Sequence, residues 1–323
     1  MLQQRREPLA EQRFAPLTGI YDPDKGSILG VHELKEGGDM GEKKTITRRQ
    51  LVKDLRELGL SQGQTVMLHA SIKSIGPQIE GGPKTVLDAL FDVLNESGTI
   101  MMLVGWKDNP YNLFDADFQE DIDQWPEDKR QKFYESSPAF DPLHSLADIG
   151  IMGAMSEFFR TYPGSIRSRH PLGYSAVGKL AHYVLKDQQW NYREGAGSPL
   201  EKLCELGGKV LLLGSSTANV TLLHFAENLA DVPDKITVRY KMPIILDGER
   251  VWKEFEEYRF TNGIVPWPDD YFKTIVDSYI EHGNGKRGTV GMARSYLLDA
   301  KDLNSFSVNW MERNFRNLQE ADQ

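Results

Sequence analysis

Apolar residues recur along this chain in two spacings, one typical of helices and one typical of short buried strands. Residues 45–58 space three leucines for one helix face, and Gly59 ends the pattern. Apolar runs with the length of buried strands occur at 66–68, 99–104 and 210–213. The first and last of these runs each lead through a polar turn into a helical pattern, which predicts an α/β fold.

The remaining periodic segments extend this picture toward the C-terminus. The spacing predicts a hairpin of residues 237–246 and 251–260, because Asp247-Gly248 lies between two alternating runs. Residues 288–298 are interpreted as one last strand. Further helices are expected at 85–94, 150–161, 199–206, 272–282 and 302–315. No internal repeat or linker indicates a domain boundary within this part of the chain.

Composition indicates that the protein is globular, and its net charge indicates which chemical class of partner it binds. The chain has 323 residues, 40% hydrophobic and 26% charged, which are ordinary globular values. Residues 1–43 show little periodicity and are predicted to form a flexible leader, followed by a single domain over 44–323. The formal net charge of −9 argues against a nucleic-acid partner, which needs a basic surface, and favours a cationic small molecule.

The cysteine count and the hydropathy pattern indicate the compartment. The chain has one cysteine, Cys204, which excludes an intramolecular disulfide and suits a reducing compartment. Cys204 lies beside Leu203 and Leu206, so we expect it to pack in the core rather than act as a nucleophile. No apolar run reaches the roughly 18 residues of a membrane span, and no signal-peptide core is evident. We therefore expect a cytoplasmic protein with no membrane partner.

The strongest candidate for catalysis follows the run at 210–213. The helix after the polar turn, with Asn219 or Thr221 as its expected cap, carries His224 and Glu227 on one face. At the carboxyl edge of a sheet, a histidine oriented by a carboxylate can accept a proton near neutral pH. A pair with this spacing is more often structural, so the pattern alone does not decide its role.

A second strand and turn offers groups for an anion. The run at 66–68 continues into His69, and the turn from Ser71 to Gly76 supplies hydroxyls, backbone N–H groups and an ammonium. Such groups suit a phosphate, although the order of a Walker loop is absent and simple turn chemistry explains the serines equally well. The residues concerned are Ser71, Ile72, Lys73, Ser74, Ile75 and Gly76.

Acidic and aromatic residues follow the run at 99–104. Every charged residue from 108 to 128 is acidic, and aromatic residues are interleaved with them. A solvated loop is the default interpretation, but carboxylates beside aromatic faces also suit a ligand with several ammonium groups. Asp108 is the first candidate because it lies closest to the strand end. Farther along, His170 precedes a proline, so we expect it to be displayed from a loop or strand edge.

These residues also resemble a known family, the acetyl-CoA-dependent aminoglycoside 3-N-acetyltransferases. The resemblance covers about residues 45–315 and leaves out the leader and much of the stretch 109–135. Its specificity comes from the order and spacing of several motifs rather than from any single one. The matching segments are 68–76, 81–82, 98–101, 140–142, 167–172, 197–200, 211–227 and 287–293.

The resemblance implies a three-layer α/β/α sandwich with a mixed central sheet, distinct from the usual N-acetyltransferase superfamily fold. It implies transfer of an acetyl group from acetyl-CoA, without a metal, to the 3-amino group of a 2-deoxystreptamine aminoglycoside, which confers antibiotic resistance. The protein would be a monomer or a homodimer. The implied catalytic residues are His224, Glu227 and His170.

The resemblance also assigns the two binding regions. The CoA site would comprise His69, the turn from Ser71 to Gly76, Arg167 and Ser168. The aminoglycoside would meet Asp108, Trp106, Tyr111 and Asn262, the last standing where some members have a carboxylate.

Three other functions remain open at this point. A related CoA-dependent enzyme could acetylate a different amine, such as a nucleotide-linked antibiotic precursor, although the acidic residues argue against it. A serine hydrolase could use Ser71 or Ser215 with His170, but the G-x-S-x-G elbow is absent. A non-catalytic homologue would bind CoA without turnover.

Overall fold

The computed structural model falls into two compact units, residues 1–42 and 43–323. In the first unit, strands β1 (Ile20–Asp22) and β2 (Ser27–Leu29) pair antiparallel. Every structural statement below on the second unit concerns its described residues. The residues described in the two units are 20–22, 27–29, 45–110, 122–259, 263–267 and 270–316.

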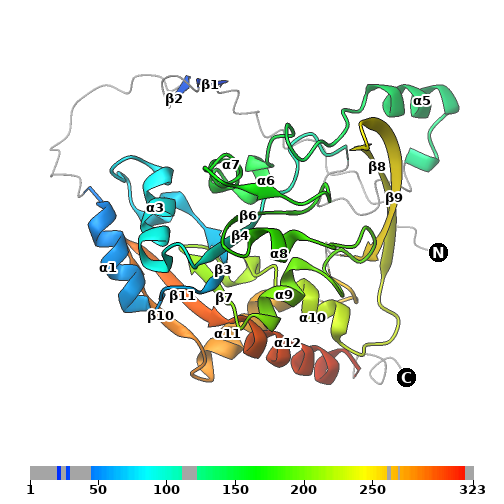
Figure 1. The fold of residues 1–323 in the computed structure, drawn as a ribbon. Helices are drawn as coiled ribbons and strands as arrows, with labels where there is room; N and C mark the ends of the chain where they lie inside the picture. The colour runs from blue at the N-terminus through cyan, green and yellow to red at the C-terminus, as the bar shows by residue number, and fades with distance from the viewer. Residues whose placement is uncertain are drawn as a thin grey trace, which may run out of the picture. The chain divides into compact units, whose positions relative to one another are not determined.

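The second unit is built on a seven-stranded mixed sheet with the order β10-β11-β7-β3-β4-β6-β5 (Figure 1). The three central strands run parallel, and these are β3 (Thr65–Ala70), β4 (Thr99–Leu103) and β7 (Lys209–Leu213). The outer strands pair antiparallel with their neighbours, and these are β5 (Ile166–Arg167), β6 (Tyr174–Gly178), β10 (Lys286–Val290) and β11 (Ala293–Asp299).

Helices cover both faces of this sheet, and a separate apolar core lies under each layer. One core packs the sheet against α1 (Arg48–Leu58), α3 (Pro83–Leu94) and α7 (Met155–Arg160). The opposite core packs it against α8 (Ala181–Leu185), α9 (Pro199–Glu205), α10 (Leu223–Leu229), α11 (Tyr271–Glu281) and α12 (Ala300–Phe315). The predicted three-layer α/β/α sandwich with a mixed sheet is confirmed.

Several local sequence signals form the elements that they predict. The Thr47 hydroxyl accepts a hydrogen bond from the amide of Gln50 and caps α1, and Gly59 ends that helix with φ 103°. Strands β8 (Thr237–Leu246) and β9 (Glu249–Tyr258) form the predicted hairpin. Its turn residues Asp247 and Gly248 both have positive φ, as a tight hairpin turn requires.

Three expectations about elements are wrong. The helix expected at 150–161 is two short helices, α6 (Ile149–Met152) and α7, because Gly153 adopts φ 79° between them. The single strand expected at 288–298 is the hairpin of β10 and β11, which reverses at Gly291. Helix α10 begins after Leu222 with no side-chain cap, because a 3₁₀ turn, η1 (Thr217–Asn219), occupies the segment before it.

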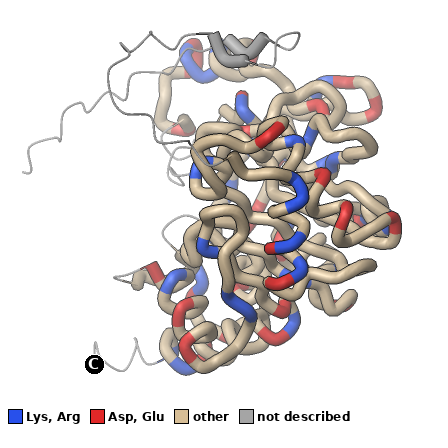
Figure 2. Tube along the Cα trace, turned by 90° about the vertical axis from the view of Figure 1, so that its left-hand side faces the viewer, with Lys and Arg blue, Asp and Glu red and all other residues tan. Residues whose placement is uncertain are grey.

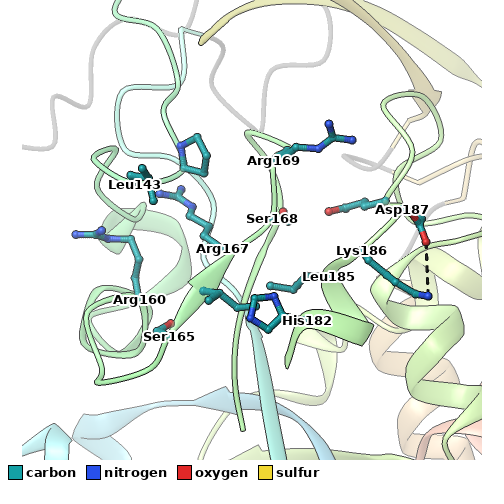
Figure 3. A pocket seen from close by; sticks show the side chains of 13 residues that line it. Leu143, Arg160, Ser165, Arg167, Ser168, Arg169, His182, Leu185, Lys186 and Asp187 are labelled. Atoms are coloured by element: carbon teal, nitrogen blue, oxygen red, sulfur yellow. Dashed lines mark ion pairs between the residues drawn. The ribbon is translucent and has the colours of Figure 1, made fainter. Parts of the chain in front are cut away.

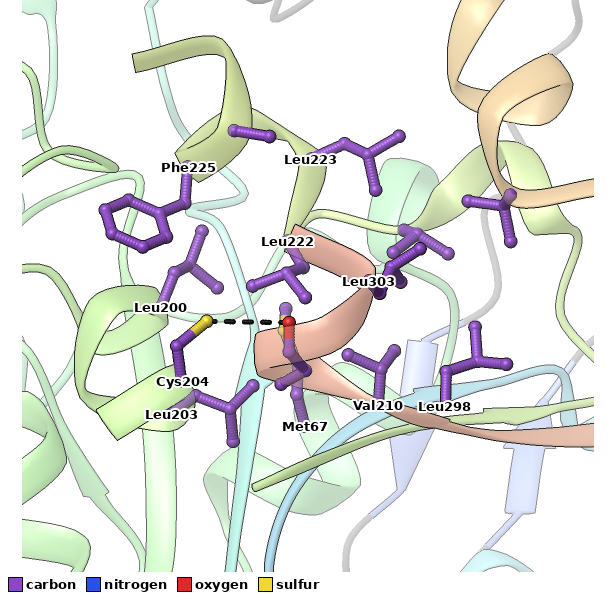
Figure 4. Close-up of a cluster of buried hydrophobic side chains, with 14 of the residues drawn as sticks. Met67, Leu200, Leu203, Cys204, Val210, Leu222, Leu223, Phe225, Leu298 and Leu303 are labelled. Carbon is purple, nitrogen blue, oxygen red and sulfur yellow. Dashed lines mark hydrogen bonds between the residues drawn. The ribbon is translucent and has the colours of Figure 1, made fainter. Parts of the chain in front are cut away.

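The expectation for Cys204 is confirmed. Its thiol is buried among leucines of α9 and α10 and donates to the carbonyl of Ala300 at 3.6 Å (Figure 4). Burial raises the pKa of this thiol to about 12, which keeps it protonated and unreactive near neutral pH.

Charge and length set further limits on the described part of the chain. Acidic and basic segments are interleaved on the face seen in Figure 2, with no continuous basic stripe there. Within the described residues, no helix is long and apolar enough to cross a membrane. No cluster of three or more His, Cys, Asp and Glu side chains suited to a metal ion occurs among those residues either.

A third, smaller apolar cluster lies beneath the β8–β9 hairpin. It joins Trp106 and Phe140, whose rings meet edge to face, to Phe255 of β9 and to α5 (Glu127–Ser136). The hydrophobic periodicity does not predict this helix. The hairpin forms its own two-stranded sheet and contributes one bridge, from Ile244, to the segment at Phe140. The hairpin therefore attaches to the rest of this unit through the side chains of this cluster and through backbone hydrogen bonds at Phe140 and Tyr192.

Candidate active site

The segments with candidate chemistry converge at one edge of the central sheet. The parallel strands β3, β4 and β7 all end there, and the antiparallel strands β6 and β11 begin there. This topology brings together the turns at 71–76, 104–108, 168–173, 214–222 and 291–292. It is the edge at which open α/β folds bind their ligands.

His224 lies in the first turn of α10 at this edge. Its Nδ1 is 2.6 Å from Oε2 of Glu227, one turn farther along the helix. The other oxygen of Glu227 accepts a hydrogen bond from the hydroxyl of Tyr271, which in turn accepts one from the amide of Ile264 at 3.2 Å. This chain of hydrogen bonds fixes the carboxylate and, through it, the imidazole ring.

Glu227 is buried and His224 is partly exposed, which suits a histidine that accepts a proton from a ligand. The Glu227 side chain is 3% exposed, whereas that of His224 is 20% exposed and packs on the ring of Phe272 at 4.8 Å. Because Nδ1–H donates to the carboxylate, the lone pair of a neutral His224 lies on Nε2. Among the described residues, Nε2 has no hydrogen-bond partner, so it can accept a proton from a ligand.

Carboxylates surround a small hollow beside His224. Its lining includes the carboxylates of Glu194, Glu227 and Glu257, together with the guanidinium of Arg193. Arg193 pairs with Glu257 and lies 3.3 Å from Glu194. Because three carboxylates face one guanidinium, the local field favours a further cation.

Each of the three carboxylates is also held by a tyrosine hydroxyl. Tyr174 donates to Glu194 at 2.6 Å, Tyr240 donates to Glu257, and Tyr271 donates to Glu227. Burial raises the pKa of Tyr174 and Tyr271 well above the ordinary value and that of Tyr240 to about 12. These phenols therefore stay protonated and act as donors that stabilise the ionised carboxylates.

His170 lies in the loop between β5 and β6, as predicted, but it is 1% exposed instead of displayed. Its Nδ1 accepts from the amide of Leu172 at 3.1 Å, and its Nε2–H donates to the carbonyl of Trp190 at 3.2 Å. Burial, together with the charge of Arg193, holds the pKa of His170 well below the ordinary value. The ring is neutral, and both of its nitrogens are engaged.

The turn after β3 packs tightly against its neighbours. The hydroxyls of Ser71 and Ser74 are 2.9 Å apart at either end of the first turn of α2 (Ile72–Ile75). A Cβ at Gly214 would lie 2.6 Å from Cβ of Ser74, and one at Gly291 would lie 2.5 Å from the carbonyl oxygen of Ile75. Glycine at both positions lets the loops after β7 and β10 approach this turn.

His69 ends β3 on the same side of the sheet as α10. Side chains alternate along a strand, so His69 shares a face with Met67, which belongs to the core beneath α10. Its Nε2 is buried and has no hydrogen-bond partner among the described residues. Burial lowers the pKa of His69 to about 4, so the ring is neutral.

The other residues expected at the CoA site lie at the outer edge of the sheet. Arg167 of β5 reaches across the strand ends and donates to the carbonyls of Ser145 and Gly105, and Ser168 is 2% exposed beside Tyr174. They are three strands away from the turn at 71–76 in the order of the sheet.

The residues expected at the aminoglycoside site have different positions. Asp108 is exposed in the turn after β4, whereas Trp106 is 1% exposed in the third apolar cluster. That burial leaves the ring of Trp106 in contact with protein side chains. Tyr111 and Asn262 lie outside the described residues, as does part of the stretch 109–135.

Sequence reasoning missed the acidic lining and its tyrosine donors. One signal was available: Glu257 alternates with Phe255 on the inward face of β9, and a carboxylate at a core position of a strand is unusual without a function. Glu194 carries no comparable signal because it lies in an irregular segment. No histidine is hydrogen-bonded to Ser71 or Ser215 among the described residues, so the geometry does not favour a serine hydrolase.

The chain matches the family model described as aminoglycoside 3-N-acetyltransferase over residues 67–312. It is 41% identical over 274 residues to aminoglycoside N(3)-acetyltransferase VII of Streptomyces paromomycinus, an alignment that covers 83% of this chain and 92% of that protein. Two solved structures are also similar. The first is AAC-IIIb in a binary complex with CoASH, which has a TM-score of 0.77 and 36% identity, and the match covers 84% of this chain and 98% of that one. The second is AAC-VIa with bound sisomicin, which has a TM-score of 0.76 and 34% identity, and the match covers 84% of this chain and 100% of that one.

Proposed function

The chain belongs to the aminoglycoside 3-N-acetyltransferase family and is an acyltransferase of that family, and from this premise we propose how its own residues act. Its substrates are acetyl-CoA and an aminoglycoside, and it acetylates the 3-amino group of the 2-deoxystreptamine ring. The consequence for a cell is resistance to the drug. His224 is the general base, and transfer is direct.

The proton of the substrate amine sets the first requirement. An ammonium group has no lone pair, so it must lose a proton before its nitrogen can bond to the thioester carbon. Nε2 of His224 accepts this proton, and Glu227 stabilises the resulting imidazolium through Nδ1–H. The free amine then bonds to the thioester carbon as the carbon–sulfur bond breaks. The second proton that the nitrogen loses goes to the departing thiolate, so the products are the amide, the CoA thiol and the His224 imidazolium.

The carboxylates beside His224 provide the specificity for a polycation. Glu194 and Glu257 lie next to the base in the hollow, where they attract ammonium groups and disfavour neutral amines. We call Glu194 and Glu257 the acidic wall. His170 contacts this wall, since its Nε2 is 3.8 Å from Oε1 of Glu257. We assign to His170 a positioning role, because a neutral ring with both nitrogens engaged holds the wall in place. Asp108, which is exposed in the turn after β4, is a further proposed contact for the aminoglycoside.

The turn from Ser71 to Gly76 is the proposed cradle for CoA. It lies at the same sheet edge as His224, and its hydroxyls can donate to the negative charge that develops on the thioester oxygen. His69 supports this placement, because its unpartnered buried Nε2 lies on the α10 side of β3. The relative AAC-IIIb was solved with CoASH, which agrees with a CoA site in this fold.

The observation that carries this proposal is the hydrogen-bonded chain from Tyr271 through Glu227 to His224 beside an acidic hollow. The test is thiol release from acetyl-CoA with gentamicin, apramycin and neomycin-type drugs, followed by NMR assignment of the acetylated nitrogen. We expect the variant His224→Ala to lower kcat about 100-fold or more while CoA binding, measured by calorimetry, stays within about twofold.

The control is His282→Ala, which removes an exposed imidazole at the end of α11. It should leave turnover unchanged. If His224→Ala kept turnover within about threefold of the parent enzyme, His224 would not be the base. Absence of acetylation with every drug in the panel would overturn the proposed substrate class.

A further inference from the structure

A second cavity lies at the outer edge of the central sheet. Strand β5 pairs with β6, and no other described strand covers its far side. The cavity there has a volume of about 570 Å³ and is lined by residues of β5, of the end of α7 and of the end of α8 (Figure 3). It shares no lining residue with the hollow around His224.

The lining is basic in a chain whose formal charge is −9. Four permanent cations contribute to it, whereas Asp187 is its one carboxylate, and the cations are Arg160, Arg167, Arg169 and Lys186. Two of these are partly compensated, because Arg160 pairs with Glu157 at 2.6 Å and Lys186 lies 3.9 Å from Asp187.

The two other cations have no carboxylate in contact among the described residues. Arg167 donates to two backbone carbonyls and lies over the ring of Phe140, and Arg169 lies 5.4 Å above the ring of Trp190. Burial lowers the pKa of Arg167 to about 10, with a further contribution from the charge of Arg160. A bound anion would offset this cost of burying the guanidinium.

Three buried polar atoms of the lining have no hydrogen-bond partner among the described residues. They are Oγ of Ser165, Nε of Arg167 and Oε1 of Gln188. The first two can donate to an anion, and the third can only accept a hydrogen bond. Buried polar atoms are normally satisfied, so three orphans along one cavity point to a ligand with both kinds of group.

We propose that this cavity binds a phosphate ester of nucleotide size. Its phosphate oxygens accept from Ser165 and from the guanidinium of Arg167, with Arg169 and Lys186 at the entrance. A hydroxyl or amino group of the same ligand donates to Gln188. The volume is within the range of small-molecule pockets and exceeds what a free phosphate ion needs.

Two sources could supply this chemistry, namely the 3′-phosphoadenosine end of CoA and a free nucleotide. The inference concerns binding alone and does not rest on acetyl transfer. Competition separates the sources: if saturating CoA abolishes binding of adenosine 3′,5′-bisphosphate, the cavity holds the distal end of CoA. If the two bind together, the cavity is a separate nucleotide site. Either result supports a phosphate-ester site only when the variants described next also respond.

The experiment is calorimetry of adenosine 3′,5′-bisphosphate and of inorganic phosphate with the full chain. Removing one charged partner should weaken both ligands, so we expect Arg169→Gln to raise both Kd values about tenfold, and Ser165→Ala to raise them less. Gln188→Leu should weaken the nucleotide more than phosphate, because the proposed donor to that oxygen is a hydroxyl or amino group of the nucleoside part. The control Lys301→Gln removes an exposed cation of α12 and should change neither Kd.

Thermal unfolding of each variant without ligand checks that the cavity is intact. Failure of the parent protein to bind either ligand at millimolar concentration would overturn the proposal. Equal Kd values for the parent, Arg169→Gln and Ser165→Ala, with the variants folded, would place the ligand elsewhere and overturn it as well.

Discussion

Two oxygen atoms of Glu227 determine how His224 is presented to a ligand. One accepts from Nδ1 of the imidazole and the other from the hydroxyl of Tyr271. The carboxylate cannot rotate without breaking one of these bonds, and the ring cannot flip without losing its partner. Tyr271 is therefore a positioning residue for the proposed base, although it reaches the base only through Glu227.

Replacing Tyr271 with phenylalanine tests this arrangement. The change removes the donor to Glu227 and keeps the ring, so we expect kcat to fall about tenfold, as for other partners that orient a functional imidazole. The KM values for drug and acetyl-CoA should change little. Thiol release at saturating substrates measures the effect on kcat, and its dependence on substrate concentration gives the KM values.

A matched control is available on the same helix. Tyr279→Phe removes a hydroxyl that donates to Asp302 at 2.7 Å, away from His224. It should cost stability of about 1 kcal/mol, the usual net value of a hydrogen bond, and leave kcat unchanged. Equal losses of kcat in both variants would argue that the fold, and not the orientation of Glu227, is responsible.

At the scale of elements, the β10–β11 hairpin supports the proposed CoA turn. The amide of Met292 donates to the carbonyl of Ile75 at 2.8 Å, and the amide of Gly291 donates to Asp54 of α1 at 2.9 Å. The hairpin turn at Gly291 and Met292 therefore stabilises the Ser71–Gly76 turn, and α1 in turn stabilises the hairpin turn. The sequence motif at 287–293 gains a physical explanation from these contacts.

The substitution Gly291→Ala should expose this dependence. Gly291 has φ 62°, and its Cβ would meet the Ile75 carbonyl oxygen, so we expect a loss of about 2–4 kcal/mol in the free energy of unfolding. Displacement of the turn should also raise the KM for acetyl-CoA. Urea denaturation and steady-state kinetics measure the two effects.

Gly248→Ala separates backbone strain from the clash. Gly248 has φ 84° in the β8–β9 turn, but nothing lies within 4 Å of the added Cβ. It should cost about 1 kcal/mol and leave the KM unchanged. If Gly291→Ala and Gly248→Ala changed the free energy of unfolding and the KM for acetyl-CoA equally, the contact between Gly291 and Ile75 would not explain the effect.

These elements also show how far sequence reasoning extends. Local chemistry sufficed for α1, with its cap at Thr47, and for the β8–β9 turn at Asp247-Gly248, because the deciding contacts lie within a few residues. It failed at Gly153, where a helix breaks, and at Gly291, where a strand reverses, because an apolar pattern continues across both glycines. A glycine inside a periodic run is ambiguous unless its neighbours in space are known.

The same limit applies to the candidate site. The pairing of His224 with Glu227 was predictable because one helical turn separates them. The burial of His170 was not, since it depends on Trp190 and on the β8–β9 hairpin, which are distant in sequence. The acidic wall was not predictable either, because Glu194 and Glu257 come from segments far apart in the sequence that form no recognisable motif.

At the scale of the whole molecule, buried neutral histidines link folding to pH. An unfolded His170 has a pKa near 6.5, whereas the folded value lies well below it. Below pH 6.5 the unfolded chain therefore binds a proton that the folded chain does not. The contribution to stability is complete above that pH and is lost as the pH falls.

We expect the His170→Gln variant to lose this dependence. Its amide can donate to Trp190 and accept from Leu172, yet it does not titrate. Between pH 7 and pH 5 the parent protein should lose about 2 kcal/mol more than the variant, at about 1.4 kcal/mol per pH unit below 6.5. Urea denaturation at both pH values measures the difference.

The neighbours of His170 do not cancel this effect. Arg193 and Lys253 both disfavour the imidazolium, and Glu257, 3.8 Å away, is already paired with Arg193. As a control, Asn309→Gln changes an exposed side chain that does not titrate, and its pH dependence should match that of the parent. Parallel curves for the parent and His170→Gln would contradict the expected linkage.

The position of Glu257 on the β8–β9 hairpin has a consequence for how drug specificity evolves. Glu257 lies on a small independent sheet, whereas His224 and Glu227 lie on a helix of the main sandwich. In the proposed mechanism, mutations that remodel the hairpin change which antibiotics are recognised, while the proposed catalytic pair and its scaffold persist. Under changing drug pressure, such a division lets resistance diversify by small steps from an enzyme that keeps working.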